Sequence, residues 1–200
     1  MEIVYFGHSF FEIRAEEGRV ALDPFRKPDS PDITLITHEH PGHNKGDGFV
    51  IKAPGEYEVR DIFIIALPSF HDKEKGKKLG KNIIYTVEVE GKRLCHLGDI
   101  GHIPEEVEEI GRVDILFLPV GERTTIPLEE IPEVISLLEP KIIIPMHYRS
   151  KMREDLEPLD KFLKFLELDH YEEERLVIKD IPDDIRIISL KPIDFEGENI

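Results

Sequence analysis

The first half of the chain alternates short apolar runs with turn residues, a pattern typical of β-strands. The runs are rich in β-branched and aromatic residues, and Gly, Pro, Asp or Lys clusters separate them. This pattern predicts strands at Glu2–Phe6, Phe10–Ala15, Arg19–Leu22, Ile33–Thr37, Phe49–Lys52, Tyr57–Val59 and Ile62–Leu67. The segment Ile33–Thr37 is apolar almost throughout, so we expect it to be buried on both faces.

The second half repeats the strand pattern and adds helices. Further strands are predicted at Ile83–Val89, Arg93–Leu97, Val113–Leu118, Lys141–Pro145, Leu176–Ile178 and Ile185–Leu190. Apolar residues at helical spacing, with Pro and Gly at the ends, predict helices at Pro104–Ile110, Leu128–Leu138 and Leu159–Leu168. Two halves that are each strand-rich and then helix-bearing predict two sheets packed face to face, with the helices outside.

Length and cysteine content limit the alternatives. A chain of 200 residues fits one domain, and no shift in composition marks a linker, so we expect a single domain over residues 1–200. The single cysteine, Cys95, excludes an intramolecular disulfide and a cysteine-based zinc cluster. The longest apolar run, Ile62–Leu67, is far too short to span a membrane. Met1–Phe11 has no signal-peptide character, which predicts a cytoplasmic protein without a membrane partner.

The charge balance narrows the class of partner. The net charge is −16, from 42 acidic and 26 basic residues, and such a field repels a phosphate backbone. We therefore expect a small-molecule substrate and no nucleic acid, and the oligomeric state stays open. Abundant Lys, Glu and Ile without Trp resemble the composition of heat-adapted proteins, which predicts thermostability.

Three histidines close together follow a predicted buried strand and indicate a metal site. His38 and His40 are two residues apart, so in an extended chain they project to the same side and can grip one ion. The Pro41-Gly42 turn then redirects the chain, which lets His43 face a neighbouring position. Imidazole suits zinc, iron and related ions. The alternative is a solvated polar loop that happens to hold three histidines.

Three further candidate ligands stand at or just past the ends of other predicted strands. His71 follows Ile62–Leu67, Asp99 follows the strand that contains Cys95, and His147 follows Ile144 and Pro145. Taken singly, each has an ordinary structural explanation. Ligands that come from separate strand ends at one rim, however, are how a β-scaffold builds a metal site on rigid elements.

With these residues in place, the chain resembles the metallo-β-lactamase superfamily, and within it the small stand-alone hydrolases similar to ascorbate-6-phosphate lactonase. The superfamily signature is a strand followed by H-x-H-x-D-H, then a distant His, a Gly-Asp and a final His. Matching positions are His38, His40, His43, His71, Asp99 and His147, and the segments Phe6–Phe10, Ala21–Phe25 and Ile144–Tyr148 extend the match. The resemblance covers roughly Met1 to Tyr148. It implies a four-layer αββα sandwich, two mixed sheets with helices outside.

The resemblance also implies two metal positions. The first would use His38, His40 and His71, with Asp99 able to bridge, and the second would use His43, Asp99 and His147. One departure matters, because the aspartate of the superfamily motif is Gly42 here. We therefore expect one well-occupied zinc ion and a second that is weak or absent, with manganese or iron as alternative metals.

The implied chemistry is hydrolysis. A bound divalent ion lowers the pKa of water toward about 7, which makes hydroxide available as a nucleophile against a lactone, an ester or a phosphodiester. Asp99 and His147 are the candidate catalytic residues. A different reading, favoured by Gly42, is a metal-binding protein that has lost efficient hydrolysis and serves as a ligand sensor or interaction module.

Candidates for substrate contact or ligand support are His8, Asp23, Lys73, Tyr148 and Arg149. His8 either lines the site or is structural, and Asp23 either orients a ligand histidine through its ring N–H or forms a turn. Tyr148 and Arg149 contact an anionic substrate or simply pack. Lys73 begins a basic loop after His71 that is either a mobile flap for an anionic substrate or a solvated loop.

Overall fold

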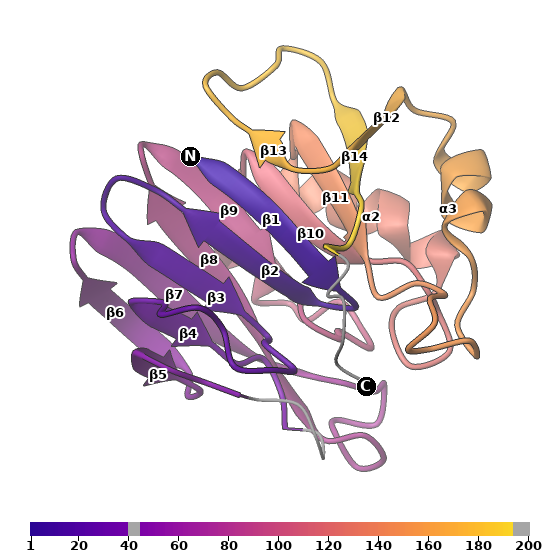
Figure 1. The fold of residues 1–200 in the computed structure, drawn as a ribbon. Coiled ribbons are helices and arrows are strands. Elements are labelled where there is room, and N and C mark those ends of the chain that lie inside the picture. Colours follow the sequence, from indigo (N-terminus) through magenta and orange to yellow (C-terminus); the bar gives the residue numbers. More distant parts are fainter. Residues whose placement is uncertain (40–44, 194–200) are drawn as a thin grey trace.

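The computed structural model describes residues 1–39 and 45–193. Within these residues the chain forms two mixed sheets that pack face to face (Figure 1). The six-stranded sheet has the order β13-β1-β2-β3-β4-β5. Its strands are β1 (Glu2–Gly7), β2 (Phe10–Arg14), β3 (Arg19–Leu22), β4 (Ile33–Leu35), β5 (Phe49–Ile51) and β13 (Leu176–Val177). The pairs from β13 to β3 are antiparallel, and β3, β4 and β5 are parallel.

The second sheet has eight strands in the order β12-β14-β11-β10-β9-β8-β7-β6. These are β6 (Gly55–Val59), β7 (Ile62–Phe70), β8 (Lys81–Val89), β9 (Lys92–His96), β10 (Ile115–Pro119), β11 (Ile142–Met146), β12 (His170–Glu173) and β14 (Arg186–Leu190). Strands β9, β10, β11, β14 and β12 are parallel, whereas β6 to β9 form an antiparallel meander. The expected pair of mixed sheets is confirmed.

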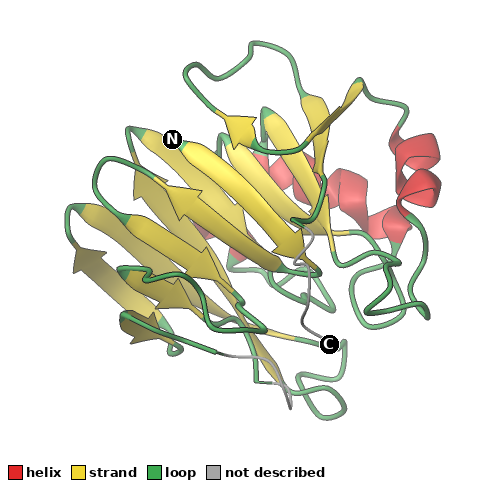
Figure 2. Cartoon of the chain, in the orientation of Figure 1, coloured by secondary structure: helices red, strands yellow, loops and turns green. Residues whose placement is uncertain are grey.

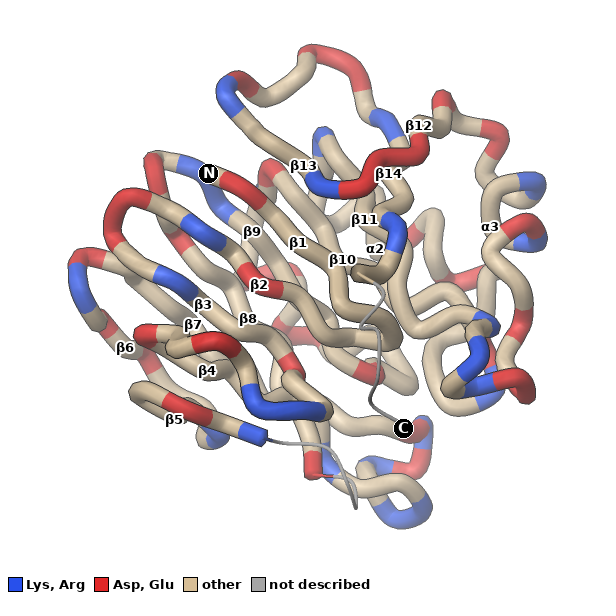
Figure 3. The backbone as a smooth tube through the Cα atoms, in the orientation of Figure 1, with Lys and Arg blue, Asp and Glu red and all other residues tan. Residues whose placement is uncertain are grey.

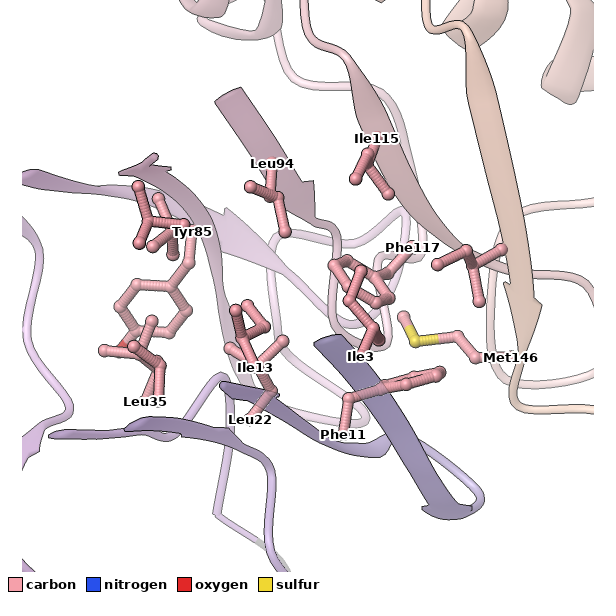
Figure 4. Packing of buried hydrophobic residues seen from close by; sticks show 14 of the residues in the cluster. Ile3, Phe11, Ile13, Leu22, Leu35, Tyr85, Leu94, Ile115, Phe117 and Met146 are labelled. Carbon is pink, nitrogen blue, oxygen red and sulfur yellow. The ribbon is translucent and has the colours of Figure 1, made fainter. Parts of the chain in front are cut away.

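The main core fills the space between the two sheets (Figure 4). Alternate residues of each strand point into it because successive side chains of a strand face opposite ways. Both sheets contribute fully or almost fully buried side chains, among them Ile3, Phe11, Ile13, Leu22, Leu35, Tyr85, Leu94, Ile115, Phe117 and Met146. Burial of each large apolar side chain stabilises the fold by roughly 1.5–3 kcal/mol.

The helices lie on one outer face of the molecule (Figure 2). They are α1 (Val107–Ile110), the 3₁₀ turn η1 (Leu128–Glu130), α2 (Ile131–Leu138) and α3 (Leu159–Leu166). Val134, Leu138 and Phe162 pack in a second core with residues of the eight-stranded sheet such as Leu116 and Ile143. In the described part of the chain, no helix covers the six-stranded sheet. Only one of the two helical layers of the expected sandwich is therefore described.

The outer face of the six-stranded sheet is instead partly polar. Glu12 is 2 % exposed and forms an ion pair with Arg14. The ring of Phe10 packs edge to face against the ring of Phe25, which lies in the loop after β3. Among the described residues, no helix has the length and apolar character that crossing a membrane requires.

Candidate metal centre

One buried carboxylate oxygen lies among three imidazole rings. Oδ2 of Asp99 is 3.0 Å from Nε2 of His147, 3.3 Å from Nε2 of His71 and 3.5 Å from Nε2 of His38. Neighbouring ligand atoms of a tetrahedral zinc site with bonds of about 2.1 Å lie ~3.4 Å apart. Oδ2 of Asp99 therefore lies at the spacing of metal ligands from each of the three imidazole nitrogens.

Strand direction explains why three of these side chains meet. Strands β7, β9 and β11 run the same way, since β7 and β9 are both antiparallel to β8, and β9 and β11 are both parallel to β10. Their carboxyl ends share one edge of the eight-stranded sheet, and His71, Asp99 and His147 follow those ends directly or within three residues. His38 follows β4 of the opposite sheet. The centre therefore sits where the two sheets meet.

Close backbone approaches hold the rim in place. A Cβ on Gly121 would lie 2.0 Å from the carbonyl oxygen of His147, and a Cβ on Gly98 would lie 2.4 Å from Oδ1 of Asn82. His147 itself has a left-handed backbone, with φ of 51°. Such a conformation costs a non-glycine residue about 1–3 kcal/mol, and it persists where the surroundings fix it.

Asp99 is held by two polar residues that sequence reasoning missed. Its N–H donates to Oδ1 of Asn82 at 3.0 Å, and Ser9 Oγ donates to Asp99 Oδ1 at 3.4 Å. The Asn82 amide also donates to Ser69 Oγ and to the carbonyl of Leu97. In the sequence, Asn82 is recognisable only as a polar residue next to the apolar run of β8. The groups that it contacts belong to other segments of the chain.

His38 is oriented by a chain of hydrogen bonds. Thr37 Oγ1 donates to Oδ2 of Asp23 at 2.7 Å, so it accepts from Nδ1–H of His38, also at 2.7 Å. The N–H of Thr37 donates to the other Asp23 oxygen. This arrangement leaves Nε2 of His38 as the lone-pair nitrogen that faces Asp99. Asp23 thus acts on the His38 ring through Thr37 and not directly. The sequence pattern predicted Thr37 only as a strand residue.

The electrostatics favour a cation. Burial acts to raise the pKa of Asp99, but the charges of His147 and His38 outweigh it and hold that pKa well below its usual range. Burial acts to lower the pKa of His71, whereas the Asp99 carboxylate raises it above its usual value. An anionic oxygen that attracts protons onto its neighbours attracts a divalent cation in the same way.

His147 supports the fit of a metal ion. Its side chain is fully buried, its Nδ1 makes no hydrogen bond within the described residues, and its Nε2 lies 3.0 Å from Oδ2 of Asp99. A buried ring nitrogen without a hydrogen bond is unfavourable, and coordination of a metal removes that penalty. Two histidine nitrogens and a carboxylate make a donor set that zinc accepts.

Two groups of three side chains could each hold an ion. One is His38, His71 and Asp99, and the other is His8, Asp99 and His147; within each group the ligand atoms lie within 4.8 Å of one another. The structure thus brings together four of the six sequence-predicted ligands and adds His8. The other two, His40 and His43, lie outside the described residues, as does Gly42, which by the resemblance stands at the position of the motif aspartate.

The remaining candidates lie in different surroundings. Lys73 pairs with Glu130, and Arg149 is exposed and donates through Nε to the carbonyl of Leu156 at 2.8 Å. Tyr148 is half-buried and packs against both cores. The 71–80 loop, which carries Lys73, is tied together by Asp72, whose carboxylate accepts four backbone N–H groups of the loop.

A pocket of 620 Å³ opens beside His38. Its walls come from residues 36–39, 52–54, 68–70 and 79–83. Lys52 and Lys81 are among them, so the pocket next to a candidate ligand is lined in part by basic side chains. Its size is that of a small-molecule site.

Comparison with known proteins agrees with this geometry. Residues 2–147 match the family model of the Beta-lactamase superfamily domain. A Thermotoga maritima structure, assigned as a Zn-dependent hydrolase of the metallo-β-lactamase superfamily, is 37% identical with a TM-score of 0.81, covering 94% of this chain and 97% of that chain. The UPF0173 metal-dependent hydrolase of Thermococcus onnurineus is 27% identical over 192 residues, 75% of this chain and 85% of the relative. That of Methanopyrus kandleri is 27% identical over 218 residues, 84% and 94% respectively. The chain belongs to the metallo-β-lactamase superfamily.

Proposed function

We propose that this protein is a metal-dependent hydrolase that acts on a small anionic substrate, with a zinc ion held by His38, His71 and Asp99. The observation that carries the proposal is the set of imidazole nitrogens at 3.0–3.5 Å from Oδ2 of Asp99. Similar members of the superfamily that are named metal-dependent hydrolases support the class of reaction. By resemblance, His40 joins this ligand set.

When bound, the ion supplies Lewis acidity and a water molecule of lowered pKa, the chemistry needed to cleave a lactone, an ester or a phosphodiester. The residues of the chain prepare that chemistry. Asp99 brings a negative charge into a buried site, where it is worth more than at the surface. Asp23 and Thr37 fix the ring of His38, so that its Nε2 is the nitrogen that binds.

The preference for an anionic substrate rests on the basic side chains near the site. Lys52 and Lys81 line the pocket beside His38, together with Glu39, which pairs with Lys52 at 3.3 Å. Lysines also gather in the 71–80 loop, directly after His71, in a chain that is strongly acidic overall (Figure 3). Local positive charge in an acidic protein concentrates anions at that point.

The test is metal content followed by turnover. Protein purified without a histidine tag and without added metal is expected to contain at least about one equivalent of zinc. Asp99→Asn is expected to weaken binding of that ion by at least about 100-fold and to abolish hydrolysis of a panel of lactones, esters and phosphodiesters. His102→Gln is the matched control, because His102 stacks on Phe70 near the rim but belongs to neither candidate ligand group.

The outcomes distinguish a hydrolase from a metal-binding protein without activity and from a protein without a metal centre. Metal binding with turnover that Asp99→Asn removes supports the hydrolase. Metal binding without turnover on any substrate class favours the sensor or interaction module that Gly42 suggests. Absence of binding, even after zinc is added back, contradicts the metal centre itself.

A further inference from the structure

The second candidate ligand group contains a histidine that the superfamily motif does not include. His8, Asp99 and His147 offer ligand atoms that all lie within 4.8 Å of one another. All three side chains are buried, with His8 5 % exposed and His147 fully buried. Asp99 also belongs to the first group, with His38 and His71.

Backbone contacts fix His8 beside His147. The carbonyl of His8 accepts the N–H of His147 at 2.9 Å and the hydroxyl of Tyr5 at 3.1 Å. Both histidines have left-handed backbones, with φ of 56° and 51°. Their rings consequently lie together, with centroids 4.4 Å apart and planes tilted by 39°. The turn between β1 and β2 is therefore shaped to present one imidazole next to another.

The nearby His96 shows what a structural histidine looks like in this fold. It is also buried, but Nδ1 accepts the N–H of Gly98 at 3.0 Å and Nε2 lies 3.2 Å from the carbonyl of Ser9. Both ring nitrogens of His96 are thus used by the backbone, and His96 belongs to neither candidate ligand group among the described residues. His8, in contrast, belongs to a candidate ligand group, and its ring centroid lies 4.4 Å from that of His147.

We propose that His8 is a ligand of a second divalent ion, together with Asp99 and His147. This inference rests on the proposed function, and it identifies the source of a ligand that the sequence lacks, because the motif carboxylate is Gly42 here. Asp99 would contribute to the binding of both ions, because it belongs to both ligand groups. The second ion binds more weakly than the first, since both share the negative charge of one carboxylate.

Titration of metal-free protein with cobalt(II) tests the proposal, with absorption spectra and elemental analysis as readouts. Wild type is expected to bind two equivalents. His8→Gln is expected to keep the first equivalent at unchanged affinity and to weaken the second by at least about 100-fold. His102→Gln is expected to match wild type, and far-UV circular dichroism of the metal-free proteins checks the fold.

A carboxylate at position 8 separates ligation from packing. His8→Asp is expected to restore the second equivalent lost in His8→Gln, whereas a packing defect at position 8 would persist with the shorter side chain. If His8→Gln does not fold, binding of only one equivalent by a folded His8→Asp would contradict the role of His8. Saturation of wild type at one equivalent, or two unchanged equivalents in His8→Gln, would overturn the role of His8 and leave the proposed function standing. Absence of cobalt binding in every protein would overturn both.

Discussion

Two buried groups behind the metal centre, Asp23 and His96, have pKa values shifted in opposite directions. Burial raises the pKa of Asp23 from 3.8 to about 7, against the hydrogen bonds that it accepts from Thr37. Burial lowers the pKa of His96 from 6.5 to about 4. Oδ2 of Asp23 and Nε2 of His96 are 4.0 Å apart. On acidification the folded protein therefore protonates the aspartate long before the histidine.

These shifts predict opposing pH dependences of stability. Between about pH 6.5 and 4 the unfolded chain protonates His96 and the folded chain does not, so His96 lowers stability as pH falls. Between about pH 7 and 3.8 the folded chain protonates Asp23 and the unfolded chain does not, so Asp23 raises stability as pH falls. The two contributions largely cancel in wild type.

Substitution should reveal each contribution in metal-free protein. From pH 6.5 to 4.5, relative to wild type, Asp23→Asn should lose stability and His96→Asn should gain it, each by up to about 1.4 kcal/mol per pH unit. Urea unfolding at three pH values measures both, and comparison with wild type removes the titration of all other groups. Two slopes parallel to wild type would show that neither shift exists.

The sequence predicts the position of some side chains of the metal centre but not of others. His71, Asp99 and His147 follow strands that run the same way, so the strand-end rule brings them to one edge. Asn82 and Ser9 are not recognisable in this way, because they reach Asp99 from separate segments after the sheets have formed. Tertiary approach, which no local pattern records, decides their roles.

The 71–80 loop, which joins β7 to β8, is held by more backbone hydrogen bonds than a mobile flap would need. Asp72 accepts the N–H groups of Glu74, Gly76, Lys78 and Leu79 at 2.7–3.1 Å. Several backbone hydrogen bonds lower the pKa of Asp72, and the one from the N–H of Leu79 has the largest effect. One carboxylate therefore closes the connection between β7 and β8.

Removal of that carboxylate should loosen the loop. Asp72→Ala is expected to speed tryptic cleavage within residues 73–81 by about tenfold, since four backbone donors lose their acceptor. Glu74→Gln serves as the control, because it removes only the ion pair with Lys78 and leaves the four hydrogen bonds intact. Equal cleavage rates in both variants would mean that Asp72 does not organise the loop.

Elements were predictable where the pattern was strong. The apolar strands appear within a few residues of their expected ends, whereas β12, with four exposed residues, has no apolar period to detect. The predicted helix over Leu128–Leu138 divides into η1 and α2. Pro132 has no N–H to donate to Leu128, so the first turn is closed instead by a 3₁₀ bond from Ile131.

At the scale of the whole molecule, the order of strands was beyond the reach of local patterns. Strand β13 pairs with β1 through Glu2 and Val177, two residues far apart in the sequence. Ion pairs likewise join distant segments: Glu2 pairs with both Arg14 and Arg175, and Arg14 also pairs with the buried Glu12. Networks of this kind gain importance at high temperature, because the cost of dehydrating charges falls.

The composition and these networks predict a heat-stable protein. The midpoint of thermal unfolding is expected above about 65 °C, the upper end of the range for mesophilic domains. Calorimetry of metal-free protein measures it without a contribution from bound ions. A midpoint near about 50 °C would contradict the expectation.

The centre around Asp99 joins the two sheets, since His38 follows β4 of one and His71, Asp99 and His147 follow strands of the other. An ion bound there grips only the native chain, so above its dissociation constant each tenfold rise in free metal adds about 1.4 kcal/mol to the unfolding free energy. Metal supply then governs how long a molecule survives proteases as well as how fast it turns over substrate. When metal is scarce, more of the molecules are metal-free, and these less stable molecules would be degraded first.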